Sequence, residues 1–331
     1  MDISLIARSF QTHKQGLGTY SKMLYESIKN EKDFNINLIS HDDSFFQKDS
    51  SLDYLFYFLI EVLFKLRKSD IYHAISPLEG FYLNKKKSIV TIHDLIPIKM
   101  AENDLQSKLT KFLFEKAIKR SVEFKKIIVD SEQTAKELSE EYNVNYDNIS
   151  IVRIAIDPKF FPKNIENDIF TIGTVSHLNK RKRISLLIES FLEANIPDSQ
   201  LLIGGKGPEL ENLKEISNND NRIKFLGFIP DEEMNDFYNL LDVFVFPTQM
   251  EGYGLPVVEA MACGKPVIML KDAYVPADVK NKTHISSIKN LAKDLNEKNF
   301  NCDIDANLKF AQEHSIEKMG EEMIEIYKNM I

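Results

Sequence analysis

The stretch DVFVFPTQMEGYGLPVVEAMACGKPVIML, residues 242–270, carries the clearest structural pattern in the chain. Its apolar runs at 242–247 and 265–270 predict two buried strands. Between them, Pro256 suits the first position of a helix and Gly264 suits the position just past its end. A strand, a loop, a helix and a second strand in this order are one unit of a parallel α/β sheet.

The same alternation of short apolar strands and amphipathic helices extends along most of the chain. Further strands are expected at 2–7, 36–40, 70–75, 88–94, 126–130, 169–175, 200–205 and 222–228. The irregular stretch 157–168 interrupts the pattern and predicts a hinge. We therefore expect two Rossmann-like, doubly wound α/β domains, with a ligand at the carboxyl ends of the strands. After Leu270 the pattern weakens, until a last amphipathic helix at about 316–330.

Composition limits the class of protein. A length of 331 residues suits two domains, and 43% hydrophobic with 28% charged residues is typical of a globular chain. The net charge of −8 disfavours nucleic acid as a partner. The two cysteines, Cys263 and Cys302, form no metal-binding pattern and suit a reducing cytoplasm. The first residues lack the features of a signal peptide, so a cytoplasmic location is expected.

The segment 52–64, LDYLFYFLIEVLF, is almost wholly apolar but shorter than a membrane-spanning helix. One interpretation is a buried helix of the first domain, which the strand expected at 70–75 favours. The other is an interfacial helix, with Lys65, Arg67 and Lys68 at lipid headgroups.

Two carboxylates border the loop that precedes the helix at Pro256. Glu251 lies in the loop, and Glu259 lies about one turn into the helix. The first amides of a helix attract phosphate or sugar oxygens, and the two carboxylates suit hydroxyl groups. Alternatively, Glu259 complements the helix dipole and Glu251 is a surface residue. The spacing by itself leaves these interpretations equal.

The segment 251–268 resembles the E-x7-E signature of the retaining GT-B glycosyltransferases of family four. Six further segments resemble family motifs in the same order: QGLGTYSKML (15–24), TIHDLIPI (91–98), VDSEQTAKEL (129–138), VSHLNKRKRISLLIESF (175–191), LLIGGKGPELENL (201–213) and IKFLGFIPDEEM (223–234). The resemblance implies the GT-B fold, with the two domains facing a central cleft. It implies domains at 1–165 and 166–313, with the helix at 314–331 packing back on the first.

The resemblance also implies roles for individual residues of the second domain. Glu251 would contact the transferred hexose as a catalytic residue, Tyr253 would bind the sugar, and Glu259 would hold the ribose hydroxyls. Residues on the diphosphate and base sides complete the set: Arg181, Lys182, Gly254 and Leu255 at the diphosphate, and Gly205, Gly207, Phe228 and Ile229 beside the base. The alternative for residues 180–183 is a solvated basic run.

Three residues of the first domain belong to the same expectation. Gly16 and Gly18, placed between a strand and a helix, would bring amides to the diphosphate. His93 would lie near the transferred sugar as a second catalytic residue, although a histidine at a strand end is often structural.

The implied reaction moves a hexose from a nucleoside-diphosphate sugar to a glycan or lipid-linked acceptor, with retention and without a metal or other cofactor. Two fixed cations would offset the charge on the leaving diphosphate. The pair Asp303 and Asp305 matches a manganese-binding pattern of another fold, but we interpret it as surface. Peripheral association with the inner face of the membrane is compatible with such acceptors.

Two features depart from the family pattern. Arg183 stands where glycine or asparagine is common, and the glycines usual after Leu270 are absent.

Three alternatives remain open. They are a GT-B-fold epimerase or phosphorylase, a non-catalytic nucleotide-sugar-binding partner, and a nicotinamide dehydrogenase. The last lacks the expected Gly-x-Gly-x-x-Gly after a strand.

Overall fold

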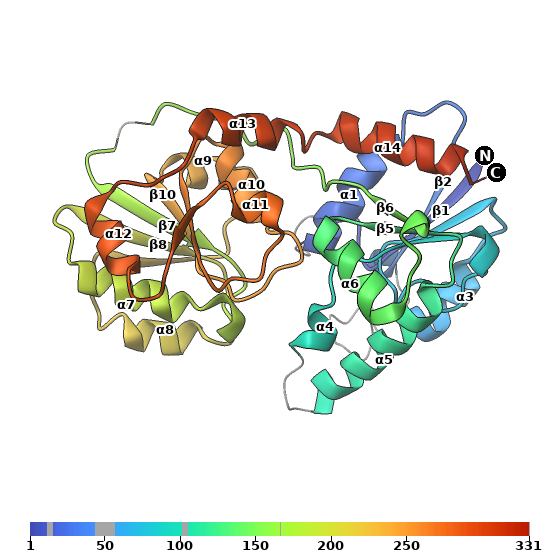
Figure 1. The fold of residues 1–331 in the computed structure, drawn as a ribbon, viewed down its shortest axis with the longest axis horizontal. Coiled ribbons are helices and arrows are strands. Elements are labelled where there is room, and N and C mark those ends of the chain that lie inside the picture. The colour runs from blue at the N-terminus through green and yellow to red at the C-terminus, as the bar shows by residue number, and fades with distance from the viewer. Residues whose placement is uncertain (12–15, 44–56, 101–104, 166, 331) are drawn as a thin grey trace. The chain divides into compact units, whose positions relative to one another are not determined.

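The computed structural model of the chain describes residues 1–11, 16–43, 57–100, 105–165 and 167–330. Its contacts divide the chain into two compact units. The first unit combines Met1–Ala155 with His314–Ile331, and the second is Ile156–Glu313. Each unit contains one six-stranded parallel sheet flanked by helices, and each is described here by itself (Figure 1).

The sheet of the first unit has the strand order β2-β1-β3-β4-β5-β6. Its strands are β1 (Asp2–Ala7), β2 (Asn35–Ser40), β3 (Ile71–Ala74), β4 (Ser88–Thr91), β5 (Lys126–Val129) and β6 (Ile149–Ile151). All neighbouring pairs are parallel. The strand order reverses between β1 and β3, which is where doubly wound sheets place ligands.

The helices of the first unit cover this sheet and include the last helix of the chain. They are α1 (Gly16–Ile28), α3 (Val62–Lys65), α4 (Ile96–Lys99), α5 (Leu105–Ser121), α6 (Glu132–Tyr142) and α14 (Ile316–Lys328). Helix α14 lies beside α1 (Figure 1). The backbones approach closely at Gly320, where an added Cβ would lie 2.4 Å from the Ser27 carbonyl oxygen. Tyr327 of the same helix contacts the buried His73 ring at 2.6 Å.

The sheet of the second unit has the order β12-β11-β10-β7-β8-β9, the arrangement of a Rossmann sheet. Its strands are β7 (Phe170–Val175), β8 (Ser199–Gly204), β9 (Ile223–Gly227), β10 (Val243–Phe246), β11 (Val267–Leu270) and β12 (His284–Ser286). These pairs are also parallel. Here the order reverses between β7 and β10, so the loops that follow these two strands lie at the switch point.

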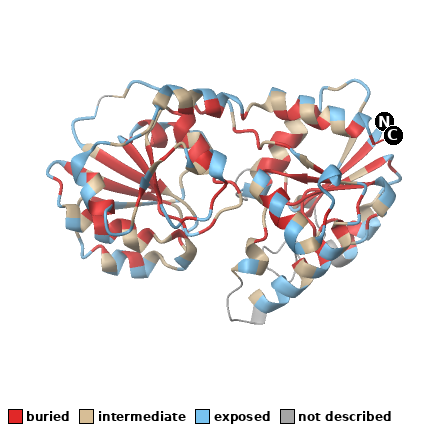
Figure 2. Ribbon diagram, viewed as in Figure 1, coloured by how far each residue is buried: buried red, intermediate tan, exposed pale blue. Residues whose placement is uncertain are grey.

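Helices flank this second sheet, and its central strands are almost wholly buried (Figure 2). The helices are α7 (Ile184–Ala194), α8 (Leu210–Ile216), α9 (Met234–Asn239), α10 (Leu255–Ala262), α11 (Ala277–Lys280), α12 (Leu291–Glu297) and α13 (Ile304–Gln312). Strands β10 and β11 read VFVF and VIML, and every residue in them is buried. Continuous apolar runs of this kind are typical of parallel strands covered on both faces.

The predicted α/β class with two Rossmann-like, doubly wound sheets is confirmed, and the predicted strands are present with shifts of up to three residues at their ends. The weak pattern after Leu270 hid β12 and three helices between residues 277 and 312. The contacts divide the chain at 155 rather than 165. Residues 156–165 pack with the second unit because the N–H groups of Phe161 and Lys163 donate to Asn235 and Asn239.

The apolar segment 52–64 fits neither of its two interpretations alone. Residues 52–56 lie outside the described part of the chain. Of the remainder, Tyr57 and Val62 are buried in the core, whereas Leu63 and Phe64 are exposed. None of the described helices is both long and apolar enough to cross a membrane.

Candidate functional site

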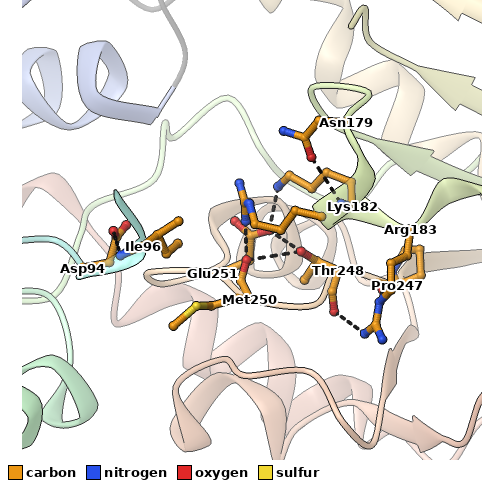
Figure 3. Close-up of polar contacts among 10 residues, drawn as sticks. Asp94, Ile96, Asn179, Lys182, Arg183, Pro247, Thr248, Met250 and Glu251 are labelled. Atoms are coloured by element: carbon orange, nitrogen blue, oxygen red, sulfur yellow. Dashed lines mark hydrogen bonds and ion pairs between the residues drawn. The ribbon is translucent and has the colours of Figure 1, made fainter. Parts of the chain in front are cut away.

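The two loops at the switch point of the second unit bring three predicted charged residues into direct contact. Arg181 and Lys182 lie in a short 3₁₀ turn after β7, and Glu251 lies in the loop after β10. Glu251 Oε1 accepts hydrogen bonds from Arg181 Nη1 at 2.8 Å and from Lys182 Nζ at 2.7 Å. Thr248 Oγ1 donates to the same oxygen at 2.5 Å (Figure 3).

This cluster is largely shielded from water, and the side chain of Lys182 is 10% exposed. Burial alone would raise the pKa of Glu251, but the charges of Lys182 and Arg181 outweigh it and lower that pKa. Burial also disfavours the charged form of Lys182 and lowers its pKa, although the charge of Glu251 acts to raise that pKa. The carboxylate therefore stays ionised and balances two cations that would otherwise lie close together.

The start of α10 supplies backbone amides beside this cluster. Gly254 precedes the helix with φ 98°, a left-handed conformation that favours glycine. Neither the N–H of Gly254 nor that of Leu255 is a donor in the described backbone hydrogen bonds outside regular helices and strands. The first N–H groups of a helix have no intrahelical acceptor. Tyr253, predicted to bind the sugar, is 4% exposed.

Glu259 lies on α10 and makes a different contact from Glu251. The Tyr238 hydroxyl donates to Glu259 Oε2 at 2.7 Å. Burial raises the pKa of Glu259 to about 7, although the Tyr238 hydrogen bond favours the ionised form. Glu259 therefore titrates near neutral pH, where the ionised form suits hydroxyl groups of a ligand.

The predicted base-side glycines lie where β8 and its loop meet the loop after β7. Gly205 has φ 115°, and an added Cβ there would lie 1.8 Å from the Ser176 carbonyl oxygen. An added Cβ at Gly207 would lie 2.3 Å from the Leu178 carbonyl oxygen. These two positions require glycine because a neighbouring backbone occupies the space of a side chain.

The other two predicted base-side residues differ in their surroundings. Phe228 is 51% exposed. Ile229 is partly buried, and its side chain fills the space where a Cβ at Gly204 would lie.

Gly16 and Gly18 lie in the first turn of α1 rather than in a loop before it. The expectation that both glycines lie between the strand and the helix was therefore wrong, and the preceding residues 12–15 lie outside the described part. Neither glycine has a positive φ.

His93 follows β4 in the first unit, and its Nδ1 lies 2.5 Å from Asp130 Oδ2. Burial would lower the pKa of His93, but the charge of Asp130 and the hydrogen bond to it raise that pKa. The Tyr20 ring packs edge-on against the imidazole, with ring centroids 4.4 Å apart. Nδ1 is thus fixed on a carboxylate, so Nε2 is the nitrogen left for another partner.

Sequence reasoning missed Thr248, Tyr238 and Asp130, which hold Glu251, Glu259 and His93 in turn. Nothing in their local patterns marks them. Tyr238 and Asp130 contact residues of other elements, and Thr248 lies in the same loop as Glu251 but outside the motif segments. Asp130 and Tyr238 could have been suspected only from their places, at a strand end and in a helix.

Asp303 and Asp305 are exposed at the start of α13. Asp303 is the N-cap, and its carboxylate accepts the Ala306 N–H at 2.9 Å. This contact gives Asp303 a structural role in starting the helix.

Known proteins resemble this chain in sequence. Residues 156–320 match the family model "Glycosyl transferases group 1". The O-antigen chain mannosyltransferase B of Escherichia coli is 26% identical over 63% of this chain and 59% of its own length. The alpha-monoglucosyldiacylglycerol synthase of Acholeplasma laidlawii is 34% identical over 40% of this chain and 35% of its own length. The matched part of the chain thus spans less than two thirds of the length of these two relatives.

Solved structures resemble the chain over nearly its whole length. Sucrose-phosphate synthase from Thermosynechococcus elongatus superimposes with a TM-score of 0.75 at 18% identity, covering 99% of this chain and 98% of that one. The lipopolysaccharide outer core galactosyltransferase WaaB, in its apo form, gives 0.70 at 14% identity and covers 100% of both chains. At such identities the likeness concerns the fold. The chain thus has the GT-B fold, and its residues 156–320 are similar to the group 1 glycosyl transferases.

Proposed function

We propose that this chain is a retaining glycosyltransferase that moves a hexose from a nucleoside-diphosphate sugar to a hydroxyl group of a glycan or lipid-linked acceptor. The observation that carries the proposal is the cluster of Arg181, Lys182 and Glu251 at the switch point of a Rossmann sheet. A donor diphosphate is an anion that these two cations and the first amides of α10 suit.

The charges of the cluster suggest how it acts. When the bond between the sugar and the diphosphate breaks, negative charge grows on the leaving phosphate. Arg181 and Lys182 offset this charge from fixed positions. Glu251 then gives up part of its contact with the cations and accepts hydrogen bonds from hydroxyl groups of the hexose. The acceptor hydroxyl attacks from the face that the diphosphate leaves, and its proton passes to the departing phosphate oxygen.

The remaining donor contacts follow the predicted assignments. Glu259 receives the ribose hydroxyls and Tyr253 the sugar, and the loop at Gly205 and Gly207 borders the base together with Phe228 and Ile229. In the first unit, the roles of Gly16 and Gly18 at the diphosphate and of His93 at the sugar stay predictions.

The names of the relatives support a sugar nucleotide and a surface glycan or glycolipid. Two of them are a mannosyltransferase of an O-antigen chain and a synthase of monoglucosyldiacylglycerol. The similar structure of Anabaena HepE was solved with UDP and glucose. From these names we infer a donor of the same class. Transfer without a metal, and a cytoplasmic location with peripheral contact to the inner face of the membrane, are part of the proposal on the resemblance described above.

A binding and turnover experiment tests the proposal. Thermal unfolding is measured with UDP, GDP and ADP and with their sugars, because a ligand that binds only the folded state raises the melting temperature. The donor found in this way is then incubated with candidate acceptors, with and without EDTA. A stable wild-type protein that responds to none of these nucleotides would contradict the proposal.

The products distinguish the proposal from its alternatives. Retention is checked by NMR of the anomeric proton of the product. An epimerase converts the sugar nucleotide without an acceptor, and a non-catalytic partner binds it without any turnover. Glu251→Ala should retain nucleotide binding but lose transfer at least about 100-fold, as expected for a group that acts mainly in the transition state.

A further inference from the structure

Arg183 has a backbone conformation that is unusual for its residue type. It directly follows Arg181 and Lys182, and its φ of 50° places it in the left-handed region. That region is sterically costly for residues with a long side chain, and it persists only when surrounding interactions impose it. The side chain of Arg183 shows which interactions those are.

The Arg183 guanidinium is almost fully used by partners in two other loops. Its Nε donates to the Pro247 carbonyl oxygen at 2.8 Å, and its Nη2 donates to the Thr248 carbonyl oxygen at 2.8 Å. It also forms a two-pronged contact with Asp272, from Nη1 at 2.7 Å and from Nη2 at 3.2 Å. Such paired contacts fix geometry as well as charge. Figure 3 shows the first two of these partners beside the Glu251 cluster.

These contacts join the loops of three neighbouring strands. Strands β11, β10 and β7 are adjacent in the sheet. Arg183 lies after β7, Pro247 and Thr248 after β10, and Asp272 after β11. One side chain from the first loop therefore holds the second by its backbone and the third by its carboxylate.

The held segments are the ones that carry the charged cluster. Thr248, whose carbonyl oxygen Arg183 binds, uses its own hydroxyl to hold Glu251 at 2.5 Å. In the same loops, the Gln249 N–H donates to the Arg181 carbonyl oxygen at 2.9 Å. A shift of the loop after β10 away from Arg183 would move Glu251 away from Arg181 and Lys182.

We propose that Arg183 and Asp272 form a clamp that positions Arg181, Lys182 and Glu251 for the diphosphate of the donor. This inference rests on the proposed function. Arg183 acts here as a positioning residue and not as a ligand, because its donors are committed to the neighbouring loops. Loops that are held before the ligand arrives lose less conformational freedom on binding, and this strengthens the binding.

The clamp is tested with Arg183→Gly, Asp272→Ala and the double variant. Glycine adopts the left-handed conformation freely, so Arg183→Gly removes the side chain without straining the backbone. Binding of UDP, GDP and ADP is measured by calorimetric titration. Each single variant should bind the preferred nucleotide about tenfold more weakly, and the double variant no more weakly than the singles, because one unit has been removed. Lys271→Ala, an exposed neighbour of Asp272, serves as the matched control.

Each outcome separates the possibilities. A wild-type protein that binds none of the three nucleotides overturns the proposed function and the clamp with it. Unchanged affinity in the variants, with or without a lower unfolding midpoint, overturns the clamp alone. If Arg183→Gly weakens binding while Asp272→Ala does not, Arg183 contacts the ligand directly and the pair is no clamp. Arg183→Lys restores the charge but not the two-pronged contact, so affinity that stays as low as in Arg183→Gly supports the clamp, whereas full recovery overturns it.

Discussion

Lys182 Nζ lies 2.7 Å from Glu251 Oε1, in a cluster where both side chains are largely buried. Because little water reaches the two side chains, each charge is stabilised mainly by the other. Removing one of them leaves a buried charge with too few partners, which is costlier than never having had the pair. The cluster should thus contribute to stability as well as to ligand binding.

Lys182→Met tests this dependence. We expect the free energy of unfolding to fall by about 2–3 kcal/mol, because Glu251 loses one of its donors while remaining buried. Nucleotide affinity should fall in the same variant. Urea denaturation and calorimetric titration measure the two effects. Lys180→Met removes an exposed lysine two residues earlier and should change neither quantity; a similar loss in this control would refute the argument from burial.

Glu259→Gln should have an effect that depends on pH. The pKa of Glu259 is raised to about 7, chiefly by burial. Such a group favours folding below its ordinary pKa of 4.5, and this contribution is lost as pH rises through about 7. Glutamine does not ionise, so the variant should gain stability over the wild type between pH 5 and pH 8, by up to about 2 kcal/mol.

Denaturation midpoints at several pH values check this expectation, with the exposed Glu233→Gln as control. If Glu259 also holds ribose hydroxyls, wild-type nucleotide affinity should rise through pH 7 and the affinity of Glu259→Gln should stay low and flat. A constant stability difference at all pH values would contradict the prediction.

Asp130→Asn should reverse the direction in which the pKa of His93 is shifted. The pKa of His93 is raised because the charge and hydrogen bond of Asp130 outweigh the effect of burial. Without that charge, burial prevails and the pKa of His93 should fall below 6.5. In the wild type, the pair stabilises the fold below pH 6.5, and this contribution is lost as pH rises through the raised pKa.

NMR titration of the histidine ring protons, assigned with His93→Gln, measures the change. An unaltered His93 pKa in Asp130→Asn would mean that the 2.5 Å contact has little electrostatic weight.

Tyr327→Phe should destabilise the first unit. The His73 ring lies fully buried between the Tyr327 hydroxyl, 2.6 Å from Nδ1, and the Thr91 hydroxyl, 2.8 Å from Nε2. Loss of the tyrosine hydroxyl leaves Nδ1 without its partner, at a cost of about 1–3 kcal/mol. Urea denaturation measures it, and Tyr25→Phe on the partly exposed side of α1 is the control.

The same histidine limits stability in acid. Burial, followed by the charge of His93, lowers the pKa of His73 to about 3. The neutral ring thus contributes stability above pH 6.5 that is lost as pH falls toward 3.

Gly320→Ala should also destabilise the protein, although alanine favours helices over glycine by about 1 kcal/mol. The new methyl group would meet the Ser27 carbonyl oxygen of α1 and force the helices apart. We expect a net loss of about 1–3 kcal/mol in thermal or chemical unfolding. The neighbouring Glu321→Ala, on the exposed side, should be neutral or slightly stabilising.

The features that the sequence predicted best are those that arise from residues adjacent in the chain. The apolar runs at 242–247 and 265–270 predicted β10 and β11 because buried parallel strands need continuous apolar residues. Arg181, Lys182 and Glu251 were found through motifs that each lie on one loop. Tyr238 and Asp130 were not, because their roles come from contacts across the fold. Thr248 was not, because it lies three residues before Glu251 and outside the motif segments.

The helices and strand after Leu270 were not predicted, for a related reason. Strand β12 has three residues and α11 has four, too few for a period to appear in the sequence. Arg183 was seen only as a departure from a family pattern. Its reach to Asp272, 89 residues away, needed coordinates.

The placement of α14 on α1 has a consequence for biosynthesis. A ribosome makes residues 1–155 first, yet the helix that supplies Tyr327 to His73 emerges only after residues 156–313. The nascent first unit must therefore wait, with the face of α1 that α14 later covers still exposed, while the whole second unit is translated. The second unit consists of Ile156–Glu313 alone, so all of its residues leave the ribosome before α14 does, and the later half of this polypeptide can mature before the earlier one.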